Sequence, residues 1–360
     1  MRLSDRATLA WQTGAFLFTQ RYEQTAVNSL SPFVLDPRIP FAVDQISPDA
    51  DLDDLGVSLY GQATATLGER LDLTTGARFD HENKKALLST SYSPAIAPSS
   101  TVDAERSFSN VSPQFSATYR FRPDRSVYGS VARGFKAGGF NPASPIGSEA
   151  YDEEYAWHLE AGVKTLLAAN RVRLNAAVFL IDWKDLQLNV PTGVQAEFYI
   201  ANVGNATSKG FELELAARAN DYLDVFSSFG VTNARFGANT VSSGLNVSDN
   251  KVPNTPDYTA TFGAQLSKAV TSAATVYGLG EIVLYGPFHY DDANLAEQDA
   301  YSLANFRAGV RWKYIFAEGW IRNAFDTDYI PIAFPYRSAS GFIGESGRPR
   351  TVGITGGVRF

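Results

Sequence analysis

The sequence predicts an all-β protein, an antiparallel up-and-down transmembrane β-barrel wall of about 14 strands, and three observations support this fold. Segment after segment alternates apolar side chains with polar or charged ones, as a strand with one apolar face requires. The connections between these segments are short and long in strict turn, which is typical of transmembrane barrels. The last segment, Thr351 to Phe360, alternates and ends on an aromatic residue, where a final strand would place a ring in the lipid interface.

The first hairpin in this pattern joins segments 57–67 and 71–80 through a tight turn at Gly68–Arg70. Within each segment the apolar residues fall on one face and the polar residues on the other. Charge is confined to the polar face, which carries Asp72, Arg78 and Asp80. The hairpin therefore has one face suited to lipid or a core and one face suited to water.

The same rhythm continues to the end of the chain. We expect short turns near Gly68, Arg122, Ala168, Asn220, Ala269 and Phe316. We expect long connections near residues 23–52, 84–106, 137–152, 187–199, 237–253, 287–299 and 330–346. Outer-membrane barrels have short periplasmic turns and longer extracellular loops, so the long connections are expected on the extracellular side.

The charged residues of the polar faces indicate which side of the wall is wet. They are Glu160, Lys164, Glu212, Glu214, Arg307 and Arg311. A charge at the bilayer midplane costs roughly 2–4 kcal/mol on a barrel wall, so these faces should line a lumen. A girdle of interfacial aromatics is expected beside the short turns, from Tyr119, Phe121, Trp312, Tyr314, Phe316 and Trp320. A soluble β-sandwich or jelly roll also alternates, but the long regular segments favour the membrane wall.

Composition excludes several classes of function. The 360 residues carry a formal net charge of −7, which argues against nucleic acid as a partner. With no Cys and three His, neither a disulfide framework nor a Cys/His metal site is expected. No segment has the roughly 20 consecutive apolar residues of a membrane helix, and the N-terminus shows no signal peptide. Because no catalytic triad, nucleophile elbow or phosphate loop is present either, we expect neither an enzyme nor a cofactor.

Several segments resemble those of one protein family, in the family's order. They are SVYGSVARGFKAGGFNP at 126–142, YDEEYAWHLEAGVKT at 151–165, ANVGNATSKGFELEL at 201–215, WIRNAFDTDYI at 320–330 and GRPRTVGITGGVRF at 347–360. The chain thus resembles the TonB-dependent outer-membrane receptors, and GFKAGGFN and DWKDLQLNV are most similar to ferric-siderophore receptors. The resemblance implies a barrel of about 22 strands with a plugged lumen, an N-terminal plug and a peptide that engages TonB.

Residues 1–360 would then form the C-terminal portion of such a barrel, with the plug and the TonB box absent from this sequence. The resemblance implies a location in the outer membrane of a Gram-negative bacterium. It also implies four partners: outer-membrane lipid, the TonB complex through the missing N-terminal region, the barrel-assembly machinery and a ferric siderophore or similar small ligand. Two alternatives remain, a self-contained 14-stranded passive channel and a surface receptor or adhesin without a transport role.

A candidate ligand site lies where a predicted strand meets a long connection. Its basic residues would attract an anionic ferric chelate, and its aromatic residue would give the chelate an apolar platform. The residues are Arg133, Lys136, Phe140 and Asn141, with Tyr199, Asn202, Tyr336 and Arg337 as further candidates. Ordinary solvation of a strand end is the alternative reading. Phe360 is expected to act in membrane assembly, by analogy with outer-membrane barrels that end on Phe.

Three other clusters are interpreted as structural. Asp49, Asp51, Asp53 and Asp54 suggest a solvated acidic loop, because their spacing lacks the glycine and terminal glutamate of an EF-hand. His81, His158 and His289 are far apart in sequence and have no paired ligand spacing, so no metal site is expected. Asn323, Asp326 and Tyr329 are expected to form a local turn at the barrel wall.

Overall fold

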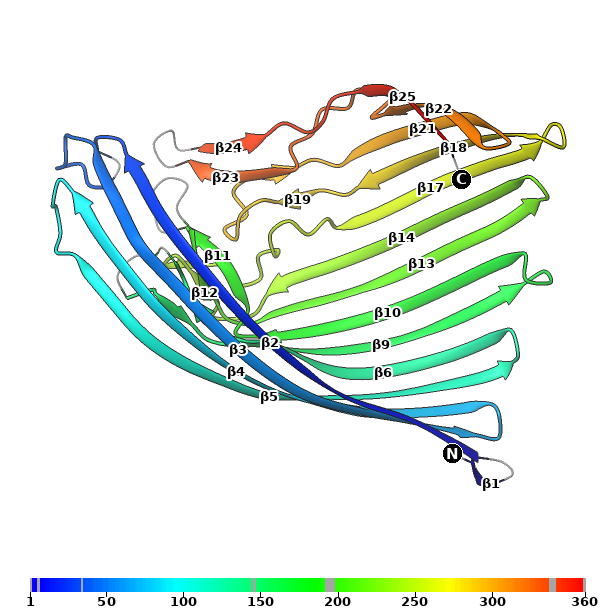
Figure 1. Ribbon diagram of the computed structural model, residues 1–360, viewed down its shortest axis with the longest axis horizontal. Coiled ribbons are helices and arrows are strands. Elements are labelled where there is room, and N and C mark those ends of the chain that lie inside the picture. Colours follow the sequence, from blue (N-terminus) through cyan, green and yellow to red (C-terminus); the bar gives the residue numbers. More distant parts are fainter. Residues whose placement is uncertain are drawn as a thin grey trace.

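A computed structural model describes residues 2–4, 7–33, 35–142, 144, 147–191, 198–336 and 341–358. One antiparallel sheet of fifteen strands dominates the molecule, with neighbours in chain order (Figure 1). The wall consists of the three-residue β1 (Arg2–Ser4) followed by β2 (Ala7–Leu30), β3 (Val43–Leu67), β4 (Leu71–Ser93), β5 (Ser100–Arg122), β6 (Arg125–Lys136), β9 (Glu154–Leu167), β10 (Val172–Lys184), β13 (Ala206–Asn220), β14 (Leu223–Phe236), β17 (Tyr258–Ala269), β18 (Ala274–Tyr285), β21 (Tyr301–Trp312), β22 (Ile315–Arg322) and β25 (Thr351–Val358). The predicted up-and-down sheet of about 14 long strands is therefore confirmed.

Short turns gather at one rim of the sheet and long connections at the other (Figure 1). The turns fall at residues 68–70, 123–124, 168–171, 221–222, 270–273 and 313–314. Five of the six predicted turn positions are met closely, and the sixth turn precedes the predicted Phe316. Both chain ends lie at the rim with the short turns (Figure 1). The alternation of connection lengths read from the sequence is thus a property of the fold.

The predictions of long connections at 23–52 and 84–106 are wrong, because most of these residues belong to strands. The strands β2 to β5 contain 23 to 25 residues each. The acidic cluster at residues 49–54 therefore lies within β3 instead of in a loop. Polar side chains occupy both faces of these upper segments, so the alternation that marks a lipid-facing strand is lost there. Pro48 is accommodated where the β3–β4 register shifts between Ile46 and Ala50.

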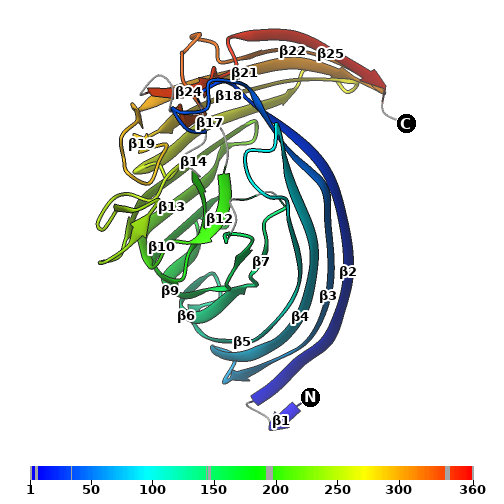
Figure 2. The same cartoon turned by 90° about the vertical axis from the view of Figure 1, so that its left-hand side faces the viewer.

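The remaining long connections form small two-stranded hairpins, of which β7 and β12 lie within the curve of the sheet (Figure 2). The sequence reading had treated them only as loops. The hairpin strands are β7 (Gly139–Phe140) with β8 (Ala150–Tyr151), β11 (Gln187–Pro191) with β12 (Phe198–Asn202), β15 (Val241–Ser242) with β16 (Leu245–Asn246), β19 (Phe288–His289) with β20 (Glu297–Gln298), and β23 (Ile332–Tyr336) with β24 (Gly341–Glu345).

The sheet curves strongly around an open interior, and its two edges remain apart (Figure 2). The strand order runs from β1 to β25, and within the described residues no ladder joins the first strands to the last. Trp11 on β2 is therefore not on a strand paired with that of Val358, as a self-closed barrel would require. The same part of the chain contains no helix that is long and apolar enough to cross a membrane.

The two faces of the wall differ as the sequence predicts. The outer face is apolar and open, with Trp11, Val352 and Ile354 exposed by 68%, 71% and 87%. By strand register, the charged residues Glu212 and Arg307 lie on the opposite, lumenal face. Two members of the predicted aromatic girdle do not belong to it, because they stand opposite lumenal residues: Trp320 pairs with Arg307, and Phe316 pairs with Arg311.

Aromatic rings on the lumenal face lie flat across glycines of the next strand. A methyl group on Gly210 would lie 2.5 Å from Cζ of Phe179, and one on Gly263 would lie 2.2 Å from Cζ of Phe226. The same close approach recurs in other strand pairs, with Tyr128 over Gly162, Tyr277 over Gly309 and Trp320 over Gly353. Each ring therefore packs on backbone that only glycine leaves uncovered.

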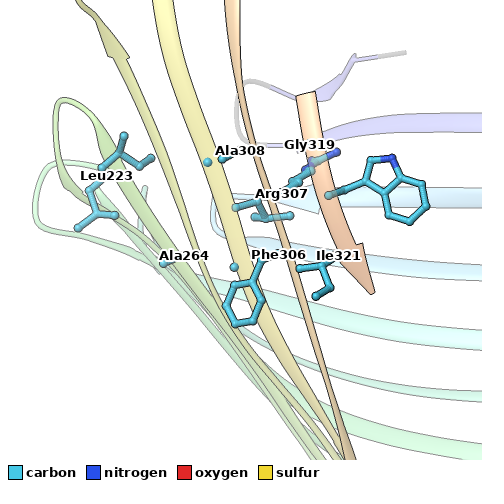
Figure 3. A pocket seen from close by; sticks show the side chains of 12 residues that line it. Leu223, Ala264, Phe306, Arg307, Ala308, Gly319 and Ile321 are labelled. Carbon is cyan, nitrogen blue, oxygen red and sulfur yellow. The ribbon is translucent and has the colours of Figure 1, made fainter. Parts of the chain in front are cut away.

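Small residues on the outer face create two shallow apolar grooves. The first, which we call the Gly278 groove, has a volume of ≈ 560 Å³ and extends across the wall from β14 to β22 (Figure 3). Ala264, Phe306 and Ala308 line it. The second, the Gly129 groove, has a volume of ≈ 580 Å³ and is lined by residues of β5, β6, β9 and β10, most of them outward-facing. Lipid tails are the natural filling for such surfaces.

Candidate mouth cavity among the long connections

The buried apolar side chains gather on the side of the long connections. The largest cluster contains Leu186, Val190, Val203, Ala206, Phe236 and Val247. A second contains Ala50, Ala86, Leu88 and Phe140, and a third contains Phe288, Tyr290 and Ala333. The connections therefore form a packed body that covers one end of the concave face, instead of a set of separate loops.

Asn141 links two of these connections. Its Nδ2 donates to the carbonyls of Ser148, at 2.9 Å, and of Ile200, at 3.0 Å. Its Oδ1 accepts the amide of Ile200 at 2.8 Å. The side chain is 4% exposed, so it satisfies backbone groups of β12 that would otherwise be buried without partners.

Asn202 and Gln187 make a second link at the base of the same hairpin. Nδ2 of Asn202 donates to the carbonyls of Asp185, at 2.8 Å, and of Asp152, at 3.0 Å, and its Oδ1 accepts the amide of Asp152 at 2.7 Å. Nε2 of Gln187 also donates to the carbonyl of Asp152, at 2.8 Å, and to that of Ala137, at 3.0 Å. The β11–β12 hairpin is thereby fixed against the connection that precedes β9.

The neighbouring connections are joined by similar amide pairs. Asn294 and the backbone of Lys251 exchange two hydrogen bonds, of 2.8 and 2.9 Å. The hydroxyl of Tyr290 donates to the carbonyl of Ile330 at 2.7 Å and contacts Oε1 of Gln298 at 3.0 Å. Burial raises the pKa of Tyr290, so the hydroxyl remains a donor at neutral pH.

A cavity of ≈ 380 Å³, which we call the mouth cavity, lies between these linked connections. The rings of Phe198 on β12 and Phe334 on β23 meet beside it with centroids 5.3 Å apart. Its lining combines apolar and polar groups: Leu188, Asn189, Pro191, Phe198, Pro253, Asn254, Tyr290, Asp291, Asp292, Ile332, Ala333 and Phe334. A partly apolar pocket with a few placed polar groups is the usual form of a small-molecule site.

The two carboxylates of the cavity have different surroundings. Asp291 is 8% exposed, and its Oδ2 accepts the amides of Leu295 and Ala296, each at 3.0 Å. Its charge is therefore used to order the loop. For Asp292, the described residues provide no hydrogen bond to the carboxylate, while its carbonyl accepts Nδ2 of Asn250 at 2.9 Å. Asp292 is thus the acid of the lining that is available to a ligand.

Arg133 has a structural use in the wall. The ladder between β5 and β6 ends beside Pro113, which has no amide hydrogen to donate. The guanidinium of Arg133 instead donates to the carbonyl of Val111 at 3.0 Å and to Oδ1 of Asn110 at 2.7 Å, and it lies 4.3 Å from the ring centre of Tyr155. Lys136, opposite Glu154 on β9, is exposed on the lumenal side.

The other predicted ligand residues are not brought together at one surface. Phe140 is 7% exposed and packs against the inner face of β3 and β4. Tyr199 packs against the largest buried cluster, and Asn141 and Asn202 act as links between connections. The side chain of Tyr336 lies outside the described part of the chain, as do Arg337 and Phe360.

Of the three clusters interpreted as structural, the turn at Asn323 has the predicted surroundings. Oδ1 of Asn323 accepts the amide of Thr327 at 2.9 Å, and Nδ2 donates to the carbonyls of Thr327 and Arg348, so the predicted local turn is confirmed. Within the residues described, no group of three or more His, Cys, Asp or Glu could hold a metal ion. The sequence reading missed the mouth cavity, whose only local signal is aromatic and amide residues within long connections, such as Phe198 and Asn254.

Comparisons with known proteins agree with the fold. The family described as TonB dependent receptor-like, beta-barrel, matches residues 2–325. The pesticin receptors of Yersinia enterocolitica and Yersinia pestis are 28% identical over 312 residues, which are 84% of this chain and 44% of theirs. The metal-pseudopaline receptor of Pseudomonas aeruginosa is 21% identical over 217 residues, which are 58% of this chain and 29% of that protein.

Solved structures share the same wall. The ferric yersiniabactin uptake receptor of Yersinia pestis superposes with a TM-score of 0.81 at 23% identity, covering 98% of this chain and 52% of that one. The siderophore receptor PiuA of Acinetobacter baumannii gives a TM-score of 0.76 at 18% identity, covering 98% and 53%. The chain spans about half the length of these relatives.

Proposed function

Because this chain belongs to the TonB-dependent receptor β-barrel family, a family of Gram-negative outer-membrane receptors, we propose that it forms the C-terminal part of a receptor that imports a ferric siderophore. In this proposal residues 1–360 are one domain, the barrel wall. The family is one of receptors and transporters, and in this proposal the chain contributes binding and passage.

The mouth cavity is the observation that carries the proposal. Its lining comes from the long connections that gather at one rim of the sheet, so a bound molecule would stand above the polar lumenal wall. Its volume of ≈ 380 Å³ is within the range of small-molecule sites. Phe198 and Phe334 offer apolar faces to an organic chelator, while Asn254 and Asp292 offer polar groups. The names of the relatives, an uptake receptor for ferric yersiniabactin among them, support the same ligand class.

The open sheet supports the view that further strands complete the barrel. Unpaired strand edges in lipid cost several kcal/mol per group, so the edges at β2 and β25 require partners. The relatives are about twice as long as this chain. We propose that the complete receptor also carries a lumenal plug and the segment that engages TonB, and that the barrel-assembly machinery inserts it with Phe360 as a recognition residue.

Two of the predicted ligand residues, Lys136 and Arg133, differ in how freely their charge can meet a ligand. Lys136 is exposed on the lumenal side of β6 and has no ion pair within the described residues, so it can attract an anionic chelate toward the mouth. Arg133 is held by Asn110, Val111 and Tyr155, so its substitution should disturb the wall before it disturbs a ligand. Lys136 is the better test of electrostatic capture.

The test is uptake of radioactive iron by a receptor-deficient strain that expresses the complete receptor. We expect uptake of iron from ferric yersiniabactin or another ferric siderophore, and this uptake should depend on TonB. The double variant Phe198→Ala/Phe334→Ala should weaken binding by roughly tenfold or more, because it removes two apolar contact faces. The matched control is Phe211→Ala, which removes an aromatic ring from the lipid-facing wall and should leave affinity unchanged.

The alternatives predict different results in the same strain. Uptake that persists without TonB and is not saturable would support a passive channel and contradict the proposal. Cell adhesion through the long connections, without uptake of any ferric siderophore, would support the surface-receptor alternative. Deleting Phe360 tests the assembly role separately: the membrane-inserted, heat-modifiable fraction should fall, and an unchanged fraction would exclude it.

A further inference from the structure

Near the rim of the long connections, most outward-facing cations of the described residues have carboxylate partners. Arg133 has none but is held by Asn110, Val111 and Tyr155, and the other two exceptions are exposed cations on neighbouring strands. Arg21 pairs with Glu23 at 2.7 Å, Lys85 with Glu105 at 3.7 Å, Lys184 with Asp182 at 3.3 Å and Lys251 with Asp257 at 2.7 Å. Lys209 on β13 and Arg235 on β14 have no ion pair in the part of the chain that the structure describes, and both are exposed. They leave uncompensated positive charge on the outer surface.

Lys209 lies directly above the lipid-facing band. It stands opposite Leu180 on β10 and Asn233 on β14. Two residues further from the rim on the same face, Phe211 stands opposite Val178 and Val231, all three of them exposed apolar side chains. Because alternate residues are about 6.6 Å apart along a strand, the ammonium group of Lys209 can reach the headgroup layer.

Arg235 is oriented for an external anion. Its Nε donates to Oδ1 of Asn233 at 3.1 Å, and one terminal nitrogen donates to the carbonyl of Asp249 at 2.7 Å. Both acceptors are neutral, so the guanidinium is held in place without losing its charge. Arg235 also stands opposite Lys251 in an isolated bridge, and Asp257 already pairs with Lys251 at 2.7 Å. Within the described residues, Arg235 therefore lacks a carboxylate partner while its neighbour has one.

The Gly129 groove lies beside these cations. Val178 and Leu180 line the groove, and the same two residues stand opposite Phe211 and Lys209 across the β10–β13 ladder. An acyl chain in the groove would therefore place its headgroup at Lys209. Trp157, outward-facing on β9 and 40% exposed, is a residue type that concentrates at the membrane interface.

We propose that Lys209 and Arg235 bind a phosphate of lipid A in the outer leaflet, with an acyl chain of the same molecule in the Gly129 groove. Charge-assisted hydrogen bonds from lysine and arginine are the usual means of phosphate recognition. The outer leaflet follows from the position of the two cations at the rim of the long connections, which is extracellular in such barrels. The inference depends on this orientation and not on which ligand is transported.

The experiment measures lipid A retained by the complete membrane-inserted receptor after purification from outer membranes, by native mass spectrometry. The double variant Lys209→Ala/Arg235→Ala should lose roughly tenfold or more of the bound lipid A, and Lys209→Arg should retain it. Lys85→Ala is the matched control, since it removes an outward cation that already has a carboxylate partner. Heat modifiability of each variant shows that the protein remains folded.

Two further comparisons identify the site. Gly129→Leu should reduce retention and Gly278→Leu should not, although both place a side chain in open space of an outer groove, with no atom closer than 3.6 Å to the added Cβ. Added phosphatidylglycerol and inorganic phosphate should not displace lipid A. Unchanged retention in the double variant, an equal loss in Lys85→Ala, or equal displacement by phosphatidylglycerol would each overturn the proposal.

Discussion

The strands β2 to β5 and the rest of the wall occupy the space above the membrane in two different ways. The first four long strands, β2 to β5, which we call the tall strands, continue as a sheet of 23 to 25 residues per strand. This is a length of about 80 Å at 3.3 Å per residue. From β6 onward the wall strands have 8 to 15 residues, and the chain leaves the sheet to form hairpins. The two regions satisfy buried backbone groups differently: ladder bonds serve the tall strands, and asparagine and glutamine side chains serve the hairpins.

The difference teaches where flexibility and specificity are expected. A ladder is insensitive to the identity of its side chains, because its hydrogen bonds are made by the backbone. A body held by Asn141, Gln187 and Asn202 depends on particular side chains at particular positions. The hairpin region can therefore change its pocket by few substitutions, while the tall strands provide a constant support.

The largest expected effect concerns the rim of the long connections, which the tall strands and the hairpin region share. The chain has no cysteine, so single-cysteine variants report position directly. Ser99→Cys in the tall region and Ser243→Cys in the hairpin region should both react with an impermeant thiol reagent on intact cells, and Glu69→Cys in a short turn should react only after the outer membrane is ruptured. Labelling of Glu69→Cys alone on intact cells would reverse the orientation.

A second prediction separates packing in the hairpin region from packing against lipid. Phe236 is 2% exposed in the largest buried cluster, whereas Phe262 is 53% exposed on the outer wall. Phe236→Ala should lower the free energy of local opening of β11 and β12 by about 3–5 kcal/mol, measured by hydrogen exchange of their amides. Phe262→Ala should leave that exchange unchanged, because lipid fills the vacated space. Equal exchange in the two variants would contradict the assignment of a packed body.

A third prediction concerns the inner face of the tall strands. Nζ of Lys84 lies 3.2 Å from Asp54 and 3.4 Å from Glu82, and its side chain is 17% exposed. Lys84→Ala leaves two neighbouring carboxylates without their cation and should lower the free energy of unfolding by roughly 1–3 kcal/mol. Lys85→Ala, on the outer face, should change it by less than about 0.5 kcal/mol. The temperature of heat modification measures both, and equal shifts would argue against a lumenal position for Lys84.

The smallest expected effect is in the connection between β2 and β3. Two hydrogen bonds from the Arg38 guanidinium, of 2.7 and 2.9 Å, lower the pKa of Asp36 to about 2. Since the folded-state pKa is below the ordinary value of 3.8, the pair favours the folded form above that value, and this contribution is lost as the pH falls toward 2. Arg38→Ala should return the pKa of Asp36 toward 3.8, as measured by carboxyl-carbon NMR, and an unchanged pKa would exclude the pairing.

The sequence predicts the membrane part of the wall because lipid imposes a strict rule. Every second residue between Val57 and Leu67 must tolerate a hydrocarbon surrounding, and the alternation follows directly. Outside the membrane both faces meet water, so Asn83 and Lys85 can face outward and the strand loses its sequence signature. This is why the upper halves of β2 to β5 were expected to be loops.

The mouth cavity was not predicted from the sequence. The sequence placed ligand residues where strands meet long connections, but none of those that the structure describes lines the mouth cavity. It did not identify Phe198 and Phe334 as neighbours, since their contact depends on two hairpins from distant parts of the chain folding toward each other. Asn141 and Asn202 were chosen for their position beside the predicted mouth, and the structure gives them the task of linking loops.

The flat rings of the lumenal face determine how much room the interior keeps. An aromatic side chain that projected from the wall would narrow the bore by the length of its ring. Phe179, Phe226 and Tyr277 instead lie across glycines of the adjacent strand, so they add buried contact area to the wall without taking width from the passage. The lumenal surface is therefore smooth at these positions, and a bulkier residue at Gly210 or Gly263 would raise a ridge on it.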